Sequence, residues 1–166
     1  MLIEIAKGTR DDALRVVRSD GSRAESRFPK KGPVPHDAVH LFVERGLGMD
    51  RGFWGIVAAG RHPEELQDIA KAAGHASASR AGPPEPHIVE LLQAERLVEC
   101  FEAGLWGGSV DPADLIAVAE TACAASRVPC PALDAADVGA IAADIAGFAR
   151  DWAALPVGAT VSLLWP

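Results

Sequence analysis

Strand-like residue patterns lie near the two ends of this chain and leave a long helical region between them. Residues 2–7 alternate apolar and polar side chains, and 13–18 and 22–28 read as strands on either side of Asp20-Gly21. The remaining β-rich segment is 157–165. Because no further strand pattern follows it in the sequence, its backbone needs partners from elsewhere. We therefore expect it to return and pair with the N-terminal strands.

Glycine at position 21 indicates how the two neighbouring N-terminal strands pair. A three-residue loop with Gly21 in the left-handed conformation places Val16 opposite Ala24 and Arg15 opposite Glu25. This register pairs apolar side chains on one face and opposite charges on the other. A two-residue loop would instead set Val16 against Glu25. The sequence therefore predicts a hairpin with one buried face and one charged face.

Helical patterns punctuated by glycine and proline fill the middle of the chain. They lie near residues 35–45, 52–59, 63–73, 87–105, 111 onwards and 134–152. Residues 75–86 are rich in alanine, serine and proline and are predicted to form a flexible internal loop. We predict an α+β fold in a single domain over residues 1–166, with a small antiparallel sheet packed against about five helices.

Composition limits the classes of partner and compartment. The formal charge is −7. Because 49% of the residues are hydrophobic, the chain can form a core that does not depend on disulfides or a metal ion. Basic residues alternate with acidic ones instead of forming a stripe, which argues against nucleic-acid binding. No apolar run is long enough for a membrane span, and the three cysteines show no CxxC spacing. A cytoplasmic protein is expected, with self-association left open.

Three segments resemble those of an uncharacterised family of bacterial proteins. They are PHDAVHLFVE at 35–44, GFWGIVAAG at 52–60 and LPVGATVSLLWP at 155–166. The family pattern has an N-terminal hairpin, then P-H-D-x-V-H-[FL]-x-V-E, then F-W-G, and a final strand after L-P-V-G that ends in W-P. This chain has Leu41 where phenylalanine is usual. The resemblance implies a compact, self-contained domain and brings no known activity.

The sharpest candidate for chemistry is the spacing of His36, His40 and Glu44. Four helical residues advance about 400°, so side chains four apart point into nearly the same sector. Imidazoles at such positions can share Zn²⁺, Ni²⁺ or Fe²⁺, with a carboxylate as third ligand. Glu95 is the alternative third ligand, because it interrupts the apolar stripe of the 87–105 helix and needs a partner. A His40–Glu95 hydrogen bond is expected with or without a metal, and Asp37 is a candidate to orient a ligand or act as a base.

Three functions remain open from the sequence. The leading interpretation is a non-catalytic interaction or structural module without a cofactor, because no nucleophile elbow, P-loop or dinucleotide motif is present. The second is a metal-binding protein or metalloenzyme built on the two histidines. The third is a small-molecule binder with a pocket between sheet and helices, lined by Trp54, Trp106 and His40. Each is an expectation about where these side chains lie.

Overall fold

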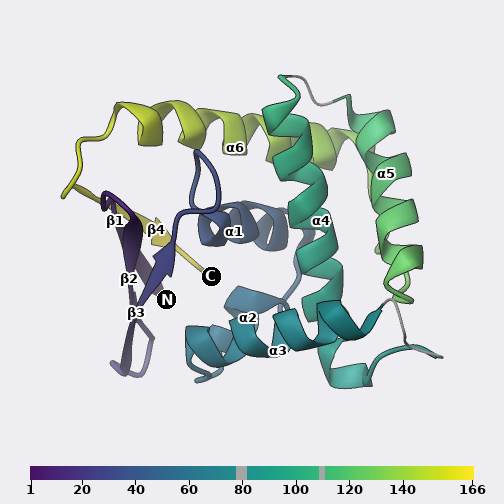
Figure 1. The fold of residues 1–166 in the computed structure, drawn as a ribbon, viewed down its shortest axis with the longest axis horizontal. Helices are drawn as coiled ribbons and strands as arrows, with labels where there is room; N and C mark the ends of the chain where they lie inside the picture. Colours follow the sequence, from purple (N-terminus) through teal and green to yellow (C-terminus); the bar gives the residue numbers. More distant parts are fainter. Residues whose placement is uncertain (78–81, 109–110) are drawn as a thin grey trace.

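The computed structural model describes residues 1–77, 82–108 and 111–166, and shows one antiparallel sheet beside a group of helices (Figure 1). The four strands are β1 (Leu2–Ala6), β2 (Asp11–Val17), β3 (Arg23–Pro29) and β4 (Thr160–Leu164). Their order in the sheet is β3-β2-β1-β4. The C-terminal strand therefore pairs with the first strand, as predicted. The terminal amine of Met1 also donates a hydrogen bond to the carbonyl oxygen of Trp165 at 2.8 Å.

The predicted hairpin register between β2 and β3 is confirmed. Val16 pairs with Ala24 and Arg15 with Glu25. Gly21 has a φ of 82°, which is the left-handed conformation that the three-residue loop requires. The observed register thus agrees with the turn chemistry of Gly21 and with the cross-strand pairing of opposite charges.

Six α-helices and one 3₁₀ turn lie on one side of the sheet within the described residues (Figure 1). They are α1 (His36–Leu47), α2 (Phe53–Ala58), α3 (Pro63–Ser77), η1 (Pro86–Ile88), α4 (Val89–Trp106), α5 (Pro112–Ala125) and α6 (Ala135–Ala154). The α+β class is confirmed. Asp111 and Asp134 cap α5 and α6 by accepting backbone N–H hydrogen bonds.

One predicted boundary is wrong. α3 continues to Ser77 instead of stopping before Gly74, so the first three residues of the predicted loop 75–86 are helical. A glycine inside a helix costs about 1 kcal/mol, which the alanines and lysine around it offset. Residues 78–81 of that loop lie outside the described residues.

Two hydrophobic clusters meet at α1, which lies in the middle of the molecule (Figure 1). Ala38 and Leu41 belong to the cluster under the sheet, whereas Val39 and Val43 belong to the cluster among α4, α5 and α6. The inner face of the sheet is buried at Ile3, Ile5, Leu14 and Val16 and partly buried at Val161 and Leu163. Because α1 is covered on several sides, its polar residues are forced inside as well.

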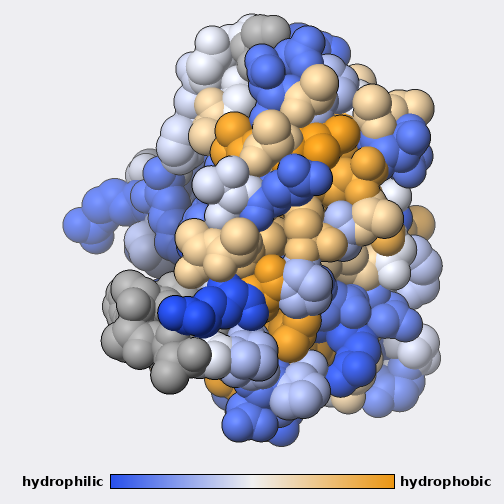
Figure 2. Space-filling model, turned by 90° about the vertical axis from the view of Figure 1, so that its right-hand side faces the viewer, coloured by the Kyte–Doolittle hydropathy of each residue, from blue (hydrophilic) through white to orange (hydrophobic). Residues whose placement is uncertain are grey.

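Apolar side chains also reach the surface on the side of the molecule that carries α5 (Figure 2). Val118 of α5 is 55% exposed, while Leu115 and Ala119 on the same helix are buried. Exposed apolar residues are normal on protein surfaces, so this band alone indicates no partner. No helix in the described part of the chain combines the length and the apolar character that crossing a bilayer would need.

Candidate metal centre

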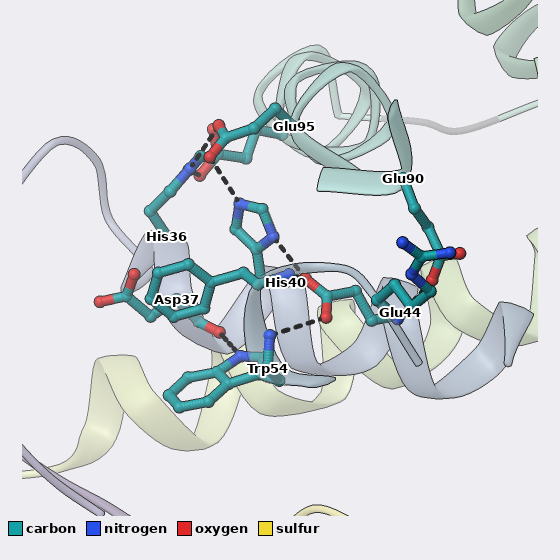
Figure 3. Close-up of polar contacts among 10 residues, drawn as sticks. His36, Asp37, His40, Glu44, Trp54, Glu90 and Glu95 are labelled. Atoms are coloured by element: carbon teal, nitrogen blue, oxygen red, sulfur yellow. Dashed lines mark hydrogen bonds and ion pairs between the residues drawn. The ribbon is translucent and has the colours of Figure 1, made fainter. Parts of the chain in front are cut away.

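The two predicted histidines of α1 face the long helix α4 across the interface between these helices (Figure 3). His36, His40 and Glu95 each offer one ligand atom, and these atoms all lie within 4.8 Å of one another. The imidazole rings of His36 and His40 have centroids 4.8 Å apart and an interplanar angle of 76°. The structure therefore brings together three of the four residues predicted as metal ligands.

His40 is the most deeply buried member, with 1% of its side chain exposed. Its Nδ1 lies 2.8 Å from Oε1 of Glu44, at hydrogen-bond distance. Its Nε2 lies 3.6 Å from Oε1 of Glu95, which is longer than a hydrogen bond. Among the described residues Nε2 of His40 has no hydrogen-bond partner. The predicted His40–Glu95 hydrogen bond is thus replaced by a longer contact, and Glu44 takes the bond.

His36 repeats the same arrangement one turn earlier. Its Nδ1 lies 3.0 Å from Oε1 of Glu102, and its Nε2 lies 3.6 Å from Oε2 of Glu95. Each imidazole therefore has a glutamate at Nδ1 and turns Nε2 towards the shared carboxylate of Glu95. Glu102 was not singled out in the sequence. It lies seven residues after Glu95, about 700° along the helix, and so on the same face.

Glu44 lies on the opposite side of His40 and is committed to backbone contacts. Its side chain is fully buried, its Oε1 accepts the N–H of Phe53, and its Oε2 accepts the N–H of Trp54, both at 2.9 Å. Two unpaired N–H groups at the start of α2 are satisfied in this way. Glu44 therefore anchors a helix and orients His40, instead of joining the group around Glu95.

The short helix α2 is held at both ends by buried charge. Glu44 binds its N-terminus, while Arg18 donates to the carbonyl oxygens of Val57 at 2.6 Å and Arg61 at 2.8 Å beyond its C-terminus. A negative charge at the N-terminus and a positive charge at the C-terminus both interact favourably with the helix dipole. Such contacts matter here because a helix of six residues would not form alone. Gly52 completes the arrangement, because a Cβ there would lie 2.6 Å from Cδ of Glu44.

The carboxylates control the protonation of the imidazoles. Burial alone would lower the pKa of His40, but Glu95 and Glu44 outweigh it and raise that pKa to about 10. Burial opposes the charged form of His36 too, yet Glu102 and Glu95 raise its pKa. Conversely, burial would raise the pKa of Glu95, and the two histidines bring it well below its usual range. Without an ion, the carboxylates therefore favour the charged form of both imidazoles.

The group opens onto a cavity of about 480 Å³ between α1, α3 and α4. Beside His36, His40 and Glu95, its lining includes Asp37 and Trp106. Trp106 is 57% exposed and lies at the end of α4. Trp54, the other tryptophan predicted to line a pocket, is fully buried in the core, and its ring N–H donates to the carbonyl oxygen of Asp37 at 2.8 Å.

Asp37 is itself a buried acid, with 7% of the residue exposed. Within the part of the chain that the structure describes, its carboxylate forms no hydrogen bond or ion pair. Burial raises the pKa of Asp37, and the nearby positive charges of His36, His40 and Lys31 act against that rise. Asp37 is thus an acid in the cavity wall whose charged form is opposed by burial.

The cysteines lie elsewhere. Cys100 and Cys123 are buried, whereas Cys130 is partly buried. Burial raises the pKa of Cys123 to about 12, so its thiol stays protonated. None of the three belongs to the group of potential metal ligands found among the described residues.

Neither family models nor curated proteins match the sequence, and no solved structure matches the fold. This agrees with the resemblance to an uncharacterised family with no known activity. The geometry of the site is therefore the basis for the function proposed below.

Proposed function

We propose that the protein binds a divalent transition-metal ion through Nε2 of His36, Nε2 of His40 and the carboxylate of Glu95. The observation that carries this proposal is the buried Nε2 of His40, which has no hydrogen-bond partner among the described residues. Leaving a buried polar atom without a hydrogen bond costs about 1–3 kcal/mol, and the contact to Glu95 at 3.6 Å is too long to be one. A metal ion placed between this atom and Glu95 would remove that cost.

The glutamates at the Nδ1 atoms support the same assignment. Metal-binding histidines usually donate their other ring N–H to a carboxylate, which fixes the tautomer and turns the free lone pair towards the ion. Glu44 serves His40 in this way at 2.8 Å, and Glu102 serves His36 at 3.0 Å. Both imidazoles thereby present Nε2 to Glu95.

The distances between the three ligand atoms would fit a metal ion if these atoms moved slightly closer together. Ligand atoms about 2.0–2.1 Å from a tetrahedral ion lie roughly 3.3 Å from one another. Both contacts from Glu95 to the histidine nitrogens are 3.6 Å, and all three ligand atoms are within 4.8 Å of one another. Binding would draw the two imidazoles together. It would also exchange two imidazolium protons for one divalent charge, which leaves the net charge of the group unchanged.

The ligand set also indicates which ions fit. Two imidazoles and one carboxylate suit Zn²⁺, Fe²⁺ or Ni²⁺ better than Ca²⁺ or Mg²⁺, which prefer oxygen ligands alone. Three protein ligands leave at least one coordination position for water or another molecule. The cavity of about 480 Å³ lies beside the histidines and gives such a molecule access.

The test is metal analysis of protein purified without a histidine tag and reconstituted with Zn²⁺ after chelation. We expect one equivalent of zinc in the wild type and in His87→Ala, a control at an exposed histidine outside the site. We expect loss of that zinc in His40→Ala and Glu95→Gln. If the reconstituted wild type retains no metal, the non-catalytic module expected from the sequence is the better account.

A further inference from the structure

Asp37 differs from every other fully or nearly buried acid in this part of the fold. Glu44 has three hydrogen-bonding contacts, and Asp12 pairs with Lys30. Asp37 is 7% exposed, borders the same cavity as the proposed metal centre, and has no partner within the described residues. Buried charges in proteins are normally paired, because desolvating them alone is costly. An external cationic group would supply the partner that the carboxylate lacks within the described residues.

The other charged groups of the cavity do not supply that partner. Arg96 pairs with Glu99 at 2.8 Å, and Lys71 lies 4.0 Å from Asp68. Lys31 is close enough to act on Asp37 electrostatically, but it is exposed and forms no ion pair with it. A ligand that places an ammonium group against Asp37 would satisfy the carboxylate from inside the cavity.

The cavity also offers an apolar surface near its mouth. Trp106 is 57% exposed, although tryptophan usually buries most of its ring. Gly32 lies against this indole, since a Cβ on Gly32 would be 2.9 Å from Cζ2 of Trp106. Phe53, which is 2% exposed, forms part of the lining deeper inside. A cavity of about 480 Å³ lies within the usual range for small-molecule sites, about 300–1,000 Å³.

We infer that the cavity binds a small zwitterion of the aromatic amino-acid class. Its ammonium group pairs with Asp37, its carboxylate occupies an open position on the metal, and its ring packs against Trp106. The carboxylate contact rests on the proposed metal centre, whereas the ammonium contact rests on Asp37 alone. The signs agree, because two neutral imidazoles, Glu95 and a divalent ion leave a net positive charge at the metal.

Three probes separate these contacts by isothermal titration calorimetry. L-phenylalanine carries both charged groups, 3-phenylpropionate lacks the amine, and 2-phenylethylamine lacks the carboxylate. Each is titrated into zinc-loaded and metal-free protein, as wild type, as Asp37→Asn and as Asp144→Asn. Asp144 is an exposed aspartate of α6 and serves as the matched control.

We expect Asp37→Asn to weaken L-phenylalanine binding at least tenfold, because a charge-assisted contact is lost. The same substitution should leave 3-phenylpropionate binding to the zinc form within twofold, which also shows that the variant is folded. Metal removal should weaken L-phenylalanine and 3-phenylpropionate but leave 2-phenylethylamine unchanged. Asp144→Asn should match the wild type throughout.

Equal L-phenylalanine affinity in wild type and Asp37→Asn would overturn the inference, as would no binding to a protein that holds zinc. The first result would mean that the amino acid chelates the ion without Asp37. If zinc itself does not bind, the proposed function fails first. In that case Asp37-dependent binding of 2-phenylethylamine to the metal-free protein would still support the ammonium contact, and its absence would reject it.

Discussion

His40 separates a buried glutamate from a partly buried one, and the two have different surroundings. On one side, Glu44 is fully buried and accepts hydrogen bonds from two backbone N–H groups and from the imidazole. On the other side, Glu95 is 17% exposed, stays 3.6 Å from each histidine and borders a cavity. The Glu44 side is complete within the fold, whereas the Glu95 side leaves a buried nitrogen unsatisfied. The difference indicates that Glu44 stabilises structure, and it is the basis for the proposal that Glu95 binds a metal ion.

The largest expected effect is on the pH dependence of stability. The pKa of His40 is raised to about 10 in the folded protein, from about 6.5 when unfolded. The stabilisation it brings is fully present below pH 6.5 or so and is lost as the pH rises through about 10. At about 1.4 kcal/mol per unit, the loss is several kcal/mol. Thermal melting should show it in metal-free protein.

Zinc should suppress this loss, because the ion replaces the imidazole protons and is bound more tightly as the pH rises. The melting temperature of the zinc form should therefore hold or rise over the same pH interval. Parallel curves for the zinc-loaded and metal-free forms would show that the ion does not interact with His40.

The next effect tests the Glu44 side. Glu44→Gln should lower the free energy of unfolding by about 3 kcal/mol, since it removes a buried charge and turns an NH2 group towards at least one of the three donors that the carboxylate now accepts. Urea denaturation measures this change, with Glu120→Gln on the exposed surface of α5 as control. A loss no greater than that of the control would mean that Glu44 does not anchor α2.

Gly52→Ala perturbs the same side by steric contact alone. The new Cβ would lie 2.6 Å from Cδ of Glu44, while Gly52 has an ordinary φ of −74°. We expect a loss of about 2 kcal/mol, the usual cost of overpacking a buried site. Gly82→Ala is the matched control, because a Cβ at that position meets nothing within 4 Å. Equal stability of the two variants would contradict the close approach.

The Glu95 side should show a smaller effect on folding and a larger one on metal binding. Above about pH 10, where His40 has lost its proton and its attraction to Glu95, Glu95→Gln is expected to lower the free energy of unfolding of the metal-free protein by only about 1 kcal/mol, because the remaining contacts to the histidines are long. Zinc affinity should fall at least about 100-fold, since even residues that only orient a metal ligand account for 10–100-fold. Competition with a chelating dye measures the affinity. If Glu95→Gln strongly destabilised the fold but bound zinc with normal affinity, Glu95 would have the structural role assigned to Glu44.

The smallest effect has the opposite sign. Asp37→Asn should raise the free energy of unfolding by about 0.5–1 kcal/mol, because the unpaired buried charge is removed. Asp144→Asn should change it little, because Asp144 is exposed. A clear destabilisation by Asp37→Asn would show that its carboxylate supports the fold instead of facing the cavity.

The sequence predicted the parts of the fold that depend on local chemistry. Gly21 and the Arg15–Glu25 pair determine the hairpin register, and both can be read from neighbouring residues. The return of β4 to β1 followed from strands that otherwise lack partners. The end of α3 was missed because Gly74 was given more weight as a helix terminator than its helix-forming neighbours allow.

The candidate site was predictable in part for the same reason. Helical spacing places His36 and His40 on one face, and a charge on the apolar stripe of α4 identified Glu95. The role of Glu44 was not visible, because it depends on how residues 48–52 return the start of α2 to that carboxylate. Glu102 could have been found from its seven-residue spacing to Glu95.

The most direct test of the metal centre is zinc X-ray absorption on the reconstituted, tag-free protein. The proposed ligands predict only nitrogen and oxygen neighbours at about 2.0–2.1 Å, with the scattering pattern of two imidazoles. That pattern should be absent in His40→Ala. Sulfur neighbours at about 2.3 Å would place the ion at cysteines and contradict the assignment, as would a wild type that binds no zinc.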